Sequence, residues 1–167
     1  AMMEGIGSMY VARKLVPLSE RYPQLRIELV TSPQLVNVSR READIFLSFF
    51  KPTGRGLDSE KIGSFALSIY GSQAYFDRYE EPRRVSDLEH HHFMHYVDDL
   101  VQVESVRWLD EVIVAPTVTF HSNSMLAQMA AAASGMGLVL LPRFAVINEK
   151  ELRPVLFREV VVRRDLW

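Results

Sequence analysis

Cysteine is absent from the sequence, and so is any long hydrophobic run. Without cysteine the chain has neither disulfide bonds nor thiolate ligands for a metal, which fits a reducing compartment. No stretch approaches the roughly 20 apolar residues that a membrane-spanning helix needs. The N-terminal residues lack the basic flank and apolar core of a signal peptide. We therefore expect a cytoplasmic protein that does not contact a membrane.

The chain also lacks a surplus of positive charge, because 19 Lys and Arg residues stand against 21 Asp and Glu. A surface that binds DNA normally concentrates basic side chains along the phosphate backbone. This chain is therefore not expected to contact DNA itself. Its 167 residues, 48% hydrophobic and 24% charged, suit one large domain or two small lobes. Residues 1–3 resemble an artificial junction, so the natural protein is expected to extend upstream.

No catalytic motif is complete. Ser72 in "YGSQAY" follows a glycine but lacks the second glycine of a nucleophile elbow. The segment "EGIGSMY" has two glycines without the third that a dinucleotide-binding turn requires. The neighbouring carboxylates at 80–81 and 98–99 are interpreted as solvated loop charge, because sequence neighbours on a strand point in different directions. We expect no enzymatic activity and no cofactor.

Four histidines, His90, His91, His92 and His95, form the one cluster that suggests a metal site. Two imidazoles three or four residues apart on a helix could share a Zn²⁺ ion. However, no cysteine or suitably spaced carboxylate pair follows to complete a ligand set. The cluster is therefore interpreted as a solvated helix end with one ring in the core, and no metal is predicted.

Apolar residues recur every three or four positions over residues 8–20, which predicts a helix. Ser8 stands where an N-cap is expected. Pro17 should bend the helix or mark a turn, and Tyr22-Pro23 should end it. A second helix is expected at 33–41.

Strands alternate with the helices along the chain, which indicates an α/β fold. Residues 44–50, "DIFLSFF", are apolar enough for a fully buried strand of a parallel sheet. The segments 62–70 and 160–167 lie where two crossovers between lobes would lie. The other expected strands are 25–29, 92–96, 108–114, 118–120 and 138–141, with a short helix at 75–79, a capped helical turn before residue 92 and a helix or turn at 144–150.

The segment "NSMLAQMAAAASGMGLVLLPR", residues 123–143, joins an alanine-rich helix to an apolar strand. Between them stand Gly135 and Gly137. Glycine tolerates a positive φ at the end of a helix, and it lets the helix pack closely on the next strand, expected to be parallel.

Hydroxyl groups recur at the junctions between predicted strands and predicted helices. They belong to Ser8, to Thr31-Ser32 and to the segment His121-Ser122-Asn123, which is expected to cap the alanine-rich helix. Helix N-termini carry free N–H groups and partial positive charge, so they bind anions. Each hydroxyl is equally explained as a simple N-cap. Gathered at one edge of an open sheet, the same groups would form a ligand site.

Five segments together resemble the effector-binding domain of LysR-type bacterial transcription regulators. They occur in that family's order and spacing, and together they span residues 4–143 of the chain. They are "EGIGSMYVARKLVPLSERYPQLRIEL", "READIFLSF", "SIYGSQAYFDRYEEP", "SDLEHHHF" and "HSNSMLAQMAAAASGMGLVLLPR".

The resemblance implies two Rossmann-like α/β lobes of the type 2 periplasmic-binding-protein kind, joined by two crossover strands. The first lobe would comprise residues 1–66 and 161–167, incomplete at both ends, and the second lobe residues 67–160. It also implies a small-molecule effector in the cleft between them. The residues implied to line that cleft are Gly7, Ser8, Thr31, Ser32, Phe49, Val97, Asp98, His121, Ser122 and Asn123.

The resemblance further implies a homodimer, and a tetramer in the full-length protein. Promoter DNA would be bound by an N-terminal winged helix-turn-helix domain that is absent from this chain. The expected function is therefore ligand-sensing regulation of transcription. The alternative is a solute-binding protein of a transport system, which would require a secretion signal upstream of residue 1.

Overall fold

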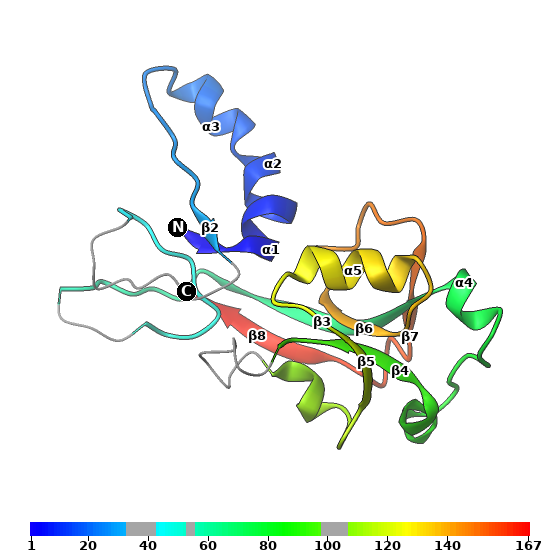
Figure 1. Ribbon diagram of the computed structural model, residues 1–167. Helices are drawn as coiled ribbons and strands as arrows, with labels where there is room; N and C mark the ends of the chain where they lie inside the picture. Colours follow the sequence, from blue (N-terminus) through cyan, green and yellow to red (C-terminus); the bar gives the residue numbers. More distant parts are fainter. Residues whose placement is uncertain (33–42, 53–55, 98–106) are drawn as a thin grey trace.

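The computed structural model describes residues 1–32, 43–52, 56–97 and 107–167. The expected helix at 33–41 and Asp98 fall outside these residues. Figure 1 shows an N-terminal group of helices beside a larger sheet that carries one long helix, with both chain termini on the side of the N-terminal group. We call residues 1–32 and 43–52 the first lobe, and the sheet with its helices, residues 68–97 and 107–160, the second lobe.

The N-terminal helix of the first lobe begins earlier than the sequence predicts. It runs through α1 (Glu4–Ile6), a π-helical stretch (Gly7–Val11), α2 (Ala12–Lys14) and α3 (Val16–Arg21). Ser8 therefore lies inside the helix with its side chain exposed, and its prediction as an N-cap is wrong. The break between α2 and α3 confirms the effect of Pro17, which occupies the first turn of α3.

The small sheet of the first lobe is less regular than predicted. Strand β1 (Met2–Met3) pairs in parallel with β2 (Thr31–Ser32), and Met2 forms a further parallel bridge with Leu47. The predicted strands at 25–29 and 44–50 are wrong as continuous strands. Strand β1 contains only two residues, so only short parts of these two segments can form backbone hydrogen bonds with it. Their apolar side chains are exposed at Leu25 (50%), Ile27 (40%) and Ile45 (74%).

The second lobe is built on β3 (Gly63–Ser72), which pairs antiparallel with β6 (Val139–Pro142) and β7 (Leu152–Val155). Strand β4 (His92–His95) pairs in parallel with β5 (Thr117–His121), and a parallel bridge from Phe93 to Leu138 joins this pair to the start of β6. The sheet is therefore mixed. The strand that follows the alanine-rich helix is parallel to β4 but antiparallel to β3.

Two antiparallel strands connect the lobes, as the sequence predicts. The first half of β3 pairs with β8 (Val162–Leu166), from Leu67 opposite Val162 to Gly63 opposite Leu166. Beyond β8, the N–H and C=O of Trp167 exchange hydrogen bonds of 2.9 Å each with those of Ser48. The β3–β8 pair thus begins in the second lobe's sheet and ends against the first lobe.

Helix α5 (Met125–Ala133) lies over the sheet of the second lobe (Figure 1). Two residues after its end lies Gly135, whose φ of +89° confirms the predicted left-handed turn. A Cβ atom on Gly137 would stand 2.6 Å from the carbonyl oxygen of His92, so this glycine lets β6 approach β4. The predicted short helix is α4 (Gln73–Phe76), and residues Val85–His90 form the helical turn expected before β4.

Buried side chains pack on both faces of the sheet and at its junction with the first lobe. One cluster includes Ile69, Phe93 and Leu138, and another joins α5 to β6 through Met129 and Leu141. The third comprises Leu67, Trp108 and Val162 with partly buried Met3, Phe49 and Phe65 packed against it. Residues Trp108–Glu111 form a 3₁₀ turn, so the strand predicted at 108–114 is wrong. In the described residues, no helix combines the length and hydropathy of a membrane span.

Candidate functional site

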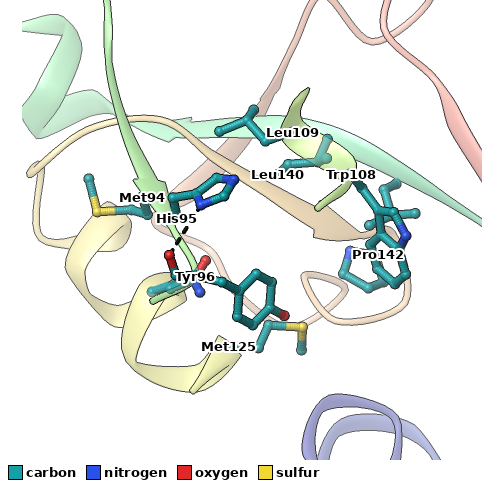
Figure 2. Close-up of a pocket in the computed structure, with 10 residues that line it drawn as sticks. Met94, His95, Tyr96, Trp108, Leu109, Met125, Leu140 and Pro142 are labelled. Carbon is teal, nitrogen blue, oxygen red and sulfur yellow. Dashed lines mark hydrogen bonds between the residues drawn. The ribbon is translucent and has the colours of Figure 1, made fainter. Parts of the chain in front are cut away.

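Two adjoining hollows lie where the first lobe meets the second. Their linings share Tyr96, Trp108, Met125 and Pro142, so we treat them as one feature, the interlobe cleft. In Figure 2 Tyr96 lies beside Met125 at the start of α5, with Trp108 and Pro142 across the hollow. The remaining lining residues are Leu67, Met94, His95, Leu109, Gln128 and Leu140 in one hollow, and Met3, Glu4, Gly5, Ile6, Phe49, Asn123 and Phe144 in the other.

The cleft is nearly closed. Each hollow has a volume of about 20 Å³, little more than one water molecule needs. Closure depends on tight packing between α1 and α5, since a Cβ atom on Gly5 would overlap the Met125 side chain. A molecule larger than water can enter only when the lobes move apart.

Aromatic rings form a continuous chain through the cleft. Phe49 contacts Phe65 and Trp108, with ring centroids 4.8 Å and 5.5 Å away. Phe65 in turn lies 5.7 Å from Phe144, which contacts Tyr10 of the π-helical stretch at 5.7 Å. These residues come from both lobes and from the linking strand β3. The cleft therefore offers flat apolar surfaces suited to an aromatic or other apolar ligand.

A hydrogen bond between side chains crosses the cleft, from the hydroxyl of Ser124 to the Glu4 carboxylate at 3.0 Å. The same hydroxyl oxygen accepts the N–H of Ala127 at 3.3 Å, so Ser124 is the N-cap of α5. The Glu4 carboxylate is thereby held at the N-terminus of α5, where the helix dipole favours negative charge. Burial raises the pKa of nearby Tyr96 to about 12, and the negative charge of Glu4 adds to that rise.

His95 is buried beside the aromatic wall. Its Nδ1 atom lies 3.2 Å from the carbonyl oxygen of Tyr96, the contact drawn in Figure 2. Its Nε2 atom lies 3.5 Å from a carboxylate oxygen of Asp110, too poorly aligned for a hydrogen bond. The ring thus fixes the backbone that presents Tyr96 to the cleft.

Of the residues predicted to line the cleft, Phe49 and Asn123 do so. Gly7 is buried against Thr31, where a Cβ atom would overlap the threonine methyl group. Ser8 and His121 have exposed side chains, and Val97, one residue after Tyr96, is half-buried. Ser32 is placed in β2 beside Met3 of β1.

Ser122 and His121 do not cap α5, contrary to the sequence prediction. Ser122 instead organises the turn before the helix. Its hydroxyl oxygen accepts the N–H of Ser124 at 3.1 Å, and its carbonyl oxygen accepts the side-chain amide of Gln128 at 2.8 Å. A serine two residues further along the chain takes the capping position because it begins the hydrogen-bonded turns of α5.

Most of the lining was missed by sequence reasoning. Glu4 and Gly5 precede the predicted helix start, and Trp108 was placed in a strand where the structure has a 3₁₀ turn. The acidic Glu4 just before "GIGS" was an available signal, since carboxylates favour the first turn of a helix. The aromatic contacts join residues far apart in sequence, so no local pattern could reveal them.

The histidine cluster does not form a metal site within the described part of the chain, where no three His, Cys, Asp or Glu residues are grouped to hold an ion. Two of its rings are buried, His91 and His95, rather than the one expected. The hydroxyl of Tyr75 lies 3.0 Å from Nδ1 of His91 and accepts the N–H of His92 at 3.1 Å. Through these contacts with Tyr75, His91 and His92 anchor the start of β4 to α4.

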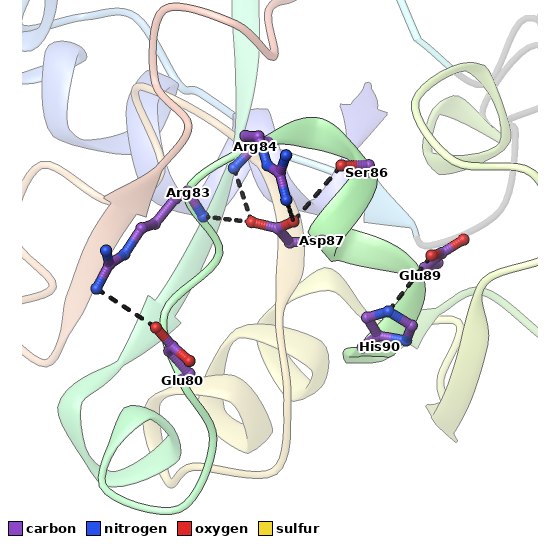
Figure 3. Close-up of polar contacts among 7 residues, drawn as sticks. All are labelled: Glu80, Arg83, Arg84, Ser86, Asp87, Glu89 and His90. Carbon is purple, nitrogen blue, oxygen red and sulfur yellow. Dashed lines mark hydrogen bonds and ion pairs between the residues drawn. The ribbon is translucent and has the colours of Figure 1, made fainter.

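A wider hollow of about 670 Å³ lies on the surface between Tyr79 and His91. Its polar groups already pair with one another (Figure 3). The Asp87 carboxylate accepts the N–H groups of Arg83 and Arg84 at 3.0 Å each, and these bonds, that from Arg83 foremost, lower its pKa. The Arg83 and Arg84 side chains are 82% and 80% exposed. This hollow is open surface, so the interlobe cleft remains the candidate site.

Two lobes linked by a pair of antiparallel strands, with a cleft between them, define a type 2 periplasmic-binding-protein-like fold. Residues 1–167 match the family described as the LysR substrate binding domain. The chain belongs to this family.

Known relatives agree with this assignment. The chain is 27% identical over 144 residues, 83% of its length and 49% of the relative's, to an HTH-type transcriptional regulator of Haemophilus influenzae. Its fold matches the regulatory domain of CrgA, a LysR-type transcriptional regulator from Neisseria meningitidis, with a TM-score of 0.78 and 20% identity over 99% of this chain and 84% of that one.

A second solved structure is that of the full-length Vibrio cholerae virulence activator AphB. It matches with a TM-score of 0.76 and 18% identity over 99% of this chain and 58% of AphB. The chain spans about half the length of the curated regulators it matches.

Proposed function

We propose that this chain is the effector-sensing part of a cytoplasmic LysR-type transcription regulator and catalyses no reaction. A small molecule binds in the interlobe cleft and changes how the lobes sit against each other. That change alters DNA binding by a winged helix-turn-helix domain N-terminal to this chain. The observation that carries the proposal is the cleft itself, placed between two lobes of a chain whose relatives are HTH-type regulators.

The lobe boundaries are part of the proposal. Residues 1–66 and 161–167 move as one body and residues 67–160 as the other, with the hinge in the β3–β8 pair. Support comes from the register of this pair, because Leu67 opposite Val162 marks the point where β3 leaves β8 for β6 and β7. Two extended strands are a flexible connection compared with the packed lobes on either side.

The energetic requirement for such a switch is modest. A ligand that binds one lobe arrangement about 10⁴-fold more tightly than the other, about 5.5 kcal/mol, converts a population from 1:99 to 99:1. Packing a ligand against the aromatic surfaces of the opened cleft can supply a difference of this size, because burial of one aromatic side chain alone contributes about 1.5–3 kcal/mol.

Dimerisation is the second part of the proposed signal. The N-terminal helix exposes apolar side chains, among them Val16 (56%) and Tyr10 (45%). We propose that this helix packs antiparallel against α5 of a partner chain, giving a homodimer, and a tetramer in the full-length protein. In such a dimer the partner chain would cover these apolar side chains and remove them from water.

The test uses the full-length protein and DNA fragments from the region next to its own gene. We expect a mobility shift with at least one fragment, and a change in that shift with a small molecule found by thermal-shift screening of carboxylates, amino acids and amines. Asn123→Ala should weaken that response, whereas Asn148→Ala, on an exposed turn of the second lobe, should not. A folded protein that binds no fragment would contradict the proposal.

A solute-binding protein of a transport system is the alternative. It shares the fold, so the sequence upstream of residue 1 discriminates between the two. A helix-turn-helix region of about 90 residues supports the regulator, and a secretion signal supports the transport protein. The relatives, which are HTH-type regulators, favour the first.

A further inference from the structure

Resting on the function proposed above, we propose that the effector of this chain is a flat aromatic amine and not a carboxylate. Three features of the cleft support this ligand class: its aromatic wall, the negative charge beside that wall, and the occupied N-terminus of α5.

The wall is aromatic on both sides of the cleft. Phe49 belongs to the first lobe, and Trp108, Tyr96 and Phe144 come from separate segments of the rest of the chain. When the lobes part, the contact between Phe49 and Trp108 opens, and a planar ring can take its place. Aromatic pairs gain from offset or edge contacts beyond simple burial, so a planar guest is preferred to an aliphatic one of equal size.

The charge beside this wall is negative. Among the described residues that line the two hollows, Glu4 is the one acidic side chain and none is lysine or arginine. Two guanidinium groups near the cleft are already engaged. Arg164 stacks over Trp108 at 5.4 Å while it pairs with Glu111, and Arg143 donates to the Ser68 hydroxyl at 3.0 Å and to the Phe157 carbonyl at 3.1 Å.

The helix terminus that would otherwise attract an anionic ligand is occupied. The N-terminus of α5 has its cap, Ser124, and its counter-charge, the Glu4 carboxylate, from within the chain. A ligand carboxylate placed there would meet Glu4 at close range. Like charges within a site shielded from water repel more strongly than they do in solution.

Opening of the cleft completes the argument. Because the closed hollows hold about 20 Å³ each, a ligand enters only after α1 and α5 separate. That separation breaks the hydrogen bond between Ser124 and Glu4 and leaves the carboxylate without its partner from α5. An ammonium group on the ligand restores a charge-assisted hydrogen bond at this position. The amine thus recognises the open cleft specifically.

The test compares two probes of matched size, tryptamine and indole-3-propionate, by isothermal titration calorimetry on the 167-residue chain at neutral pH. We expect tryptamine to bind at least about tenfold more tightly, the equivalent of one hydrogen bond to a charged group. Glu4→Gln should remove this preference, while Glu20→Gln, on the exposed surface of α3, should retain it. Thermal melts of both variants confirm that they fold.

Three outcomes would overturn the inference. They are tighter binding of indole-3-propionate, binding of neither probe, and a preference for tryptamine that survives Glu4→Gln. If indole-3-propionate binds and Asn123→Ala weakens that binding, the effector class is wrong while the proposed function stands. Failure of the full-length protein to bind DNA would refute the proposed function separately.

Discussion

At the scale of single residues, Ser124 connects helix stability to the position of the lobes. Its hydroxyl oxygen accepts the Ala127 N–H and its proton goes to Glu4. Ser124→Ala should lower the free energy of unfolding by about 1 kcal/mol through loss of the cap, which for a chain of this length lowers the melting temperature by roughly 2–4 °C. Ser8→Ala should leave the melting temperature unchanged, because Ser8 is exposed within the helix. Equal effects in the two variants would contradict these assignments.

His91 gives the stability of the protein a dependence on pH. Burial, together with the nearby charge of His90, lowers its pKa below the ordinary value of 6.5, while Asp87 opposes the shift. The unfolded chain then binds more protons than the folded one below pH 6.5, so this residue's contribution is complete above that pH and is lost as the pH falls.

We therefore expect the melting temperature to fall between pH 7.5 and pH 5, and to fall less in His91→Gln. The side-chain amide of glutamine can still form a hydrogen bond with the Tyr75 hydroxyl, which lies 3.0 Å from Nδ1 of His91. His121→Gln is the matched control, because the His121 side chain is exposed and His121 is not among the groups that shift the pKa of His91. A pH profile of His91→Gln that superimposes on that of the parent protein would show that His91 is not responsible.

The sequence predicts that a serine caps α5, but it does not predict which serine does so. Two serines before an alanine-rich helix indicate a cap, but the choice between Ser122 and Ser124, two positions apart, depends on where the first turn closes. Glu4 contributes to the cleft through Ser124, 120 residues away. A partner at that distance depends on the tertiary fold, and no sequence period reports it.

At the scale of elements, two glycines allow a matched comparison of valine substitutions, namely Gly137 just before β6 and Gly63 at the start of β3. Gly137→Val would place a branched side chain 2.6 Å from the His92 carbonyl oxygen, which accepts the N–H of Leu138 at 2.7 Å. We expect a loss of about 3 kcal/mol, from overpacking against backbone that cannot move aside. Gly63→Val meets open space and a strand backbone, so it should be neutral or slightly stabilising. Urea unfolding of both variants measures the difference.

Long elements with a regular pattern of apolar residues were predicted well. Short strands, whose existence depends on hydrogen bonds to a neighbouring strand, were not. Residues of β3 and α5 carry continuous apolar patterns, and both elements exist with ends shifted by a few residues. The segment 44–50 is equally apolar, yet Leu47 forms a single bridge and Ser48 pairs with Trp167. Whether an apolar run becomes a strand depends on the length of the strand beside it, which is a property of the assembled sheet.

At the scale of the whole molecule, the account depends on two bodies that move about the β3–β8 pair. The absence of cysteine makes this motion easy to measure, because introduced cysteines are the only sites that a thiol-directed spin label can reach. Glu28 in the first lobe and Lys150 in the second are exposed and suit Glu28→Cys and Lys150→Cys. Mixing the labelled chain with excess unlabelled chain keeps distances between partners out of the data.

The most direct test of a cleft that opens for its ligand is the distance distribution between these two labels, measured by pulsed electron paramagnetic resonance with and without saturating tryptamine. The account predicts a short separation without ligand, in keeping with the closed cleft, and a shift of the population to a longer separation with ligand. A single narrow distribution that does not change when the probe is bound would contradict it.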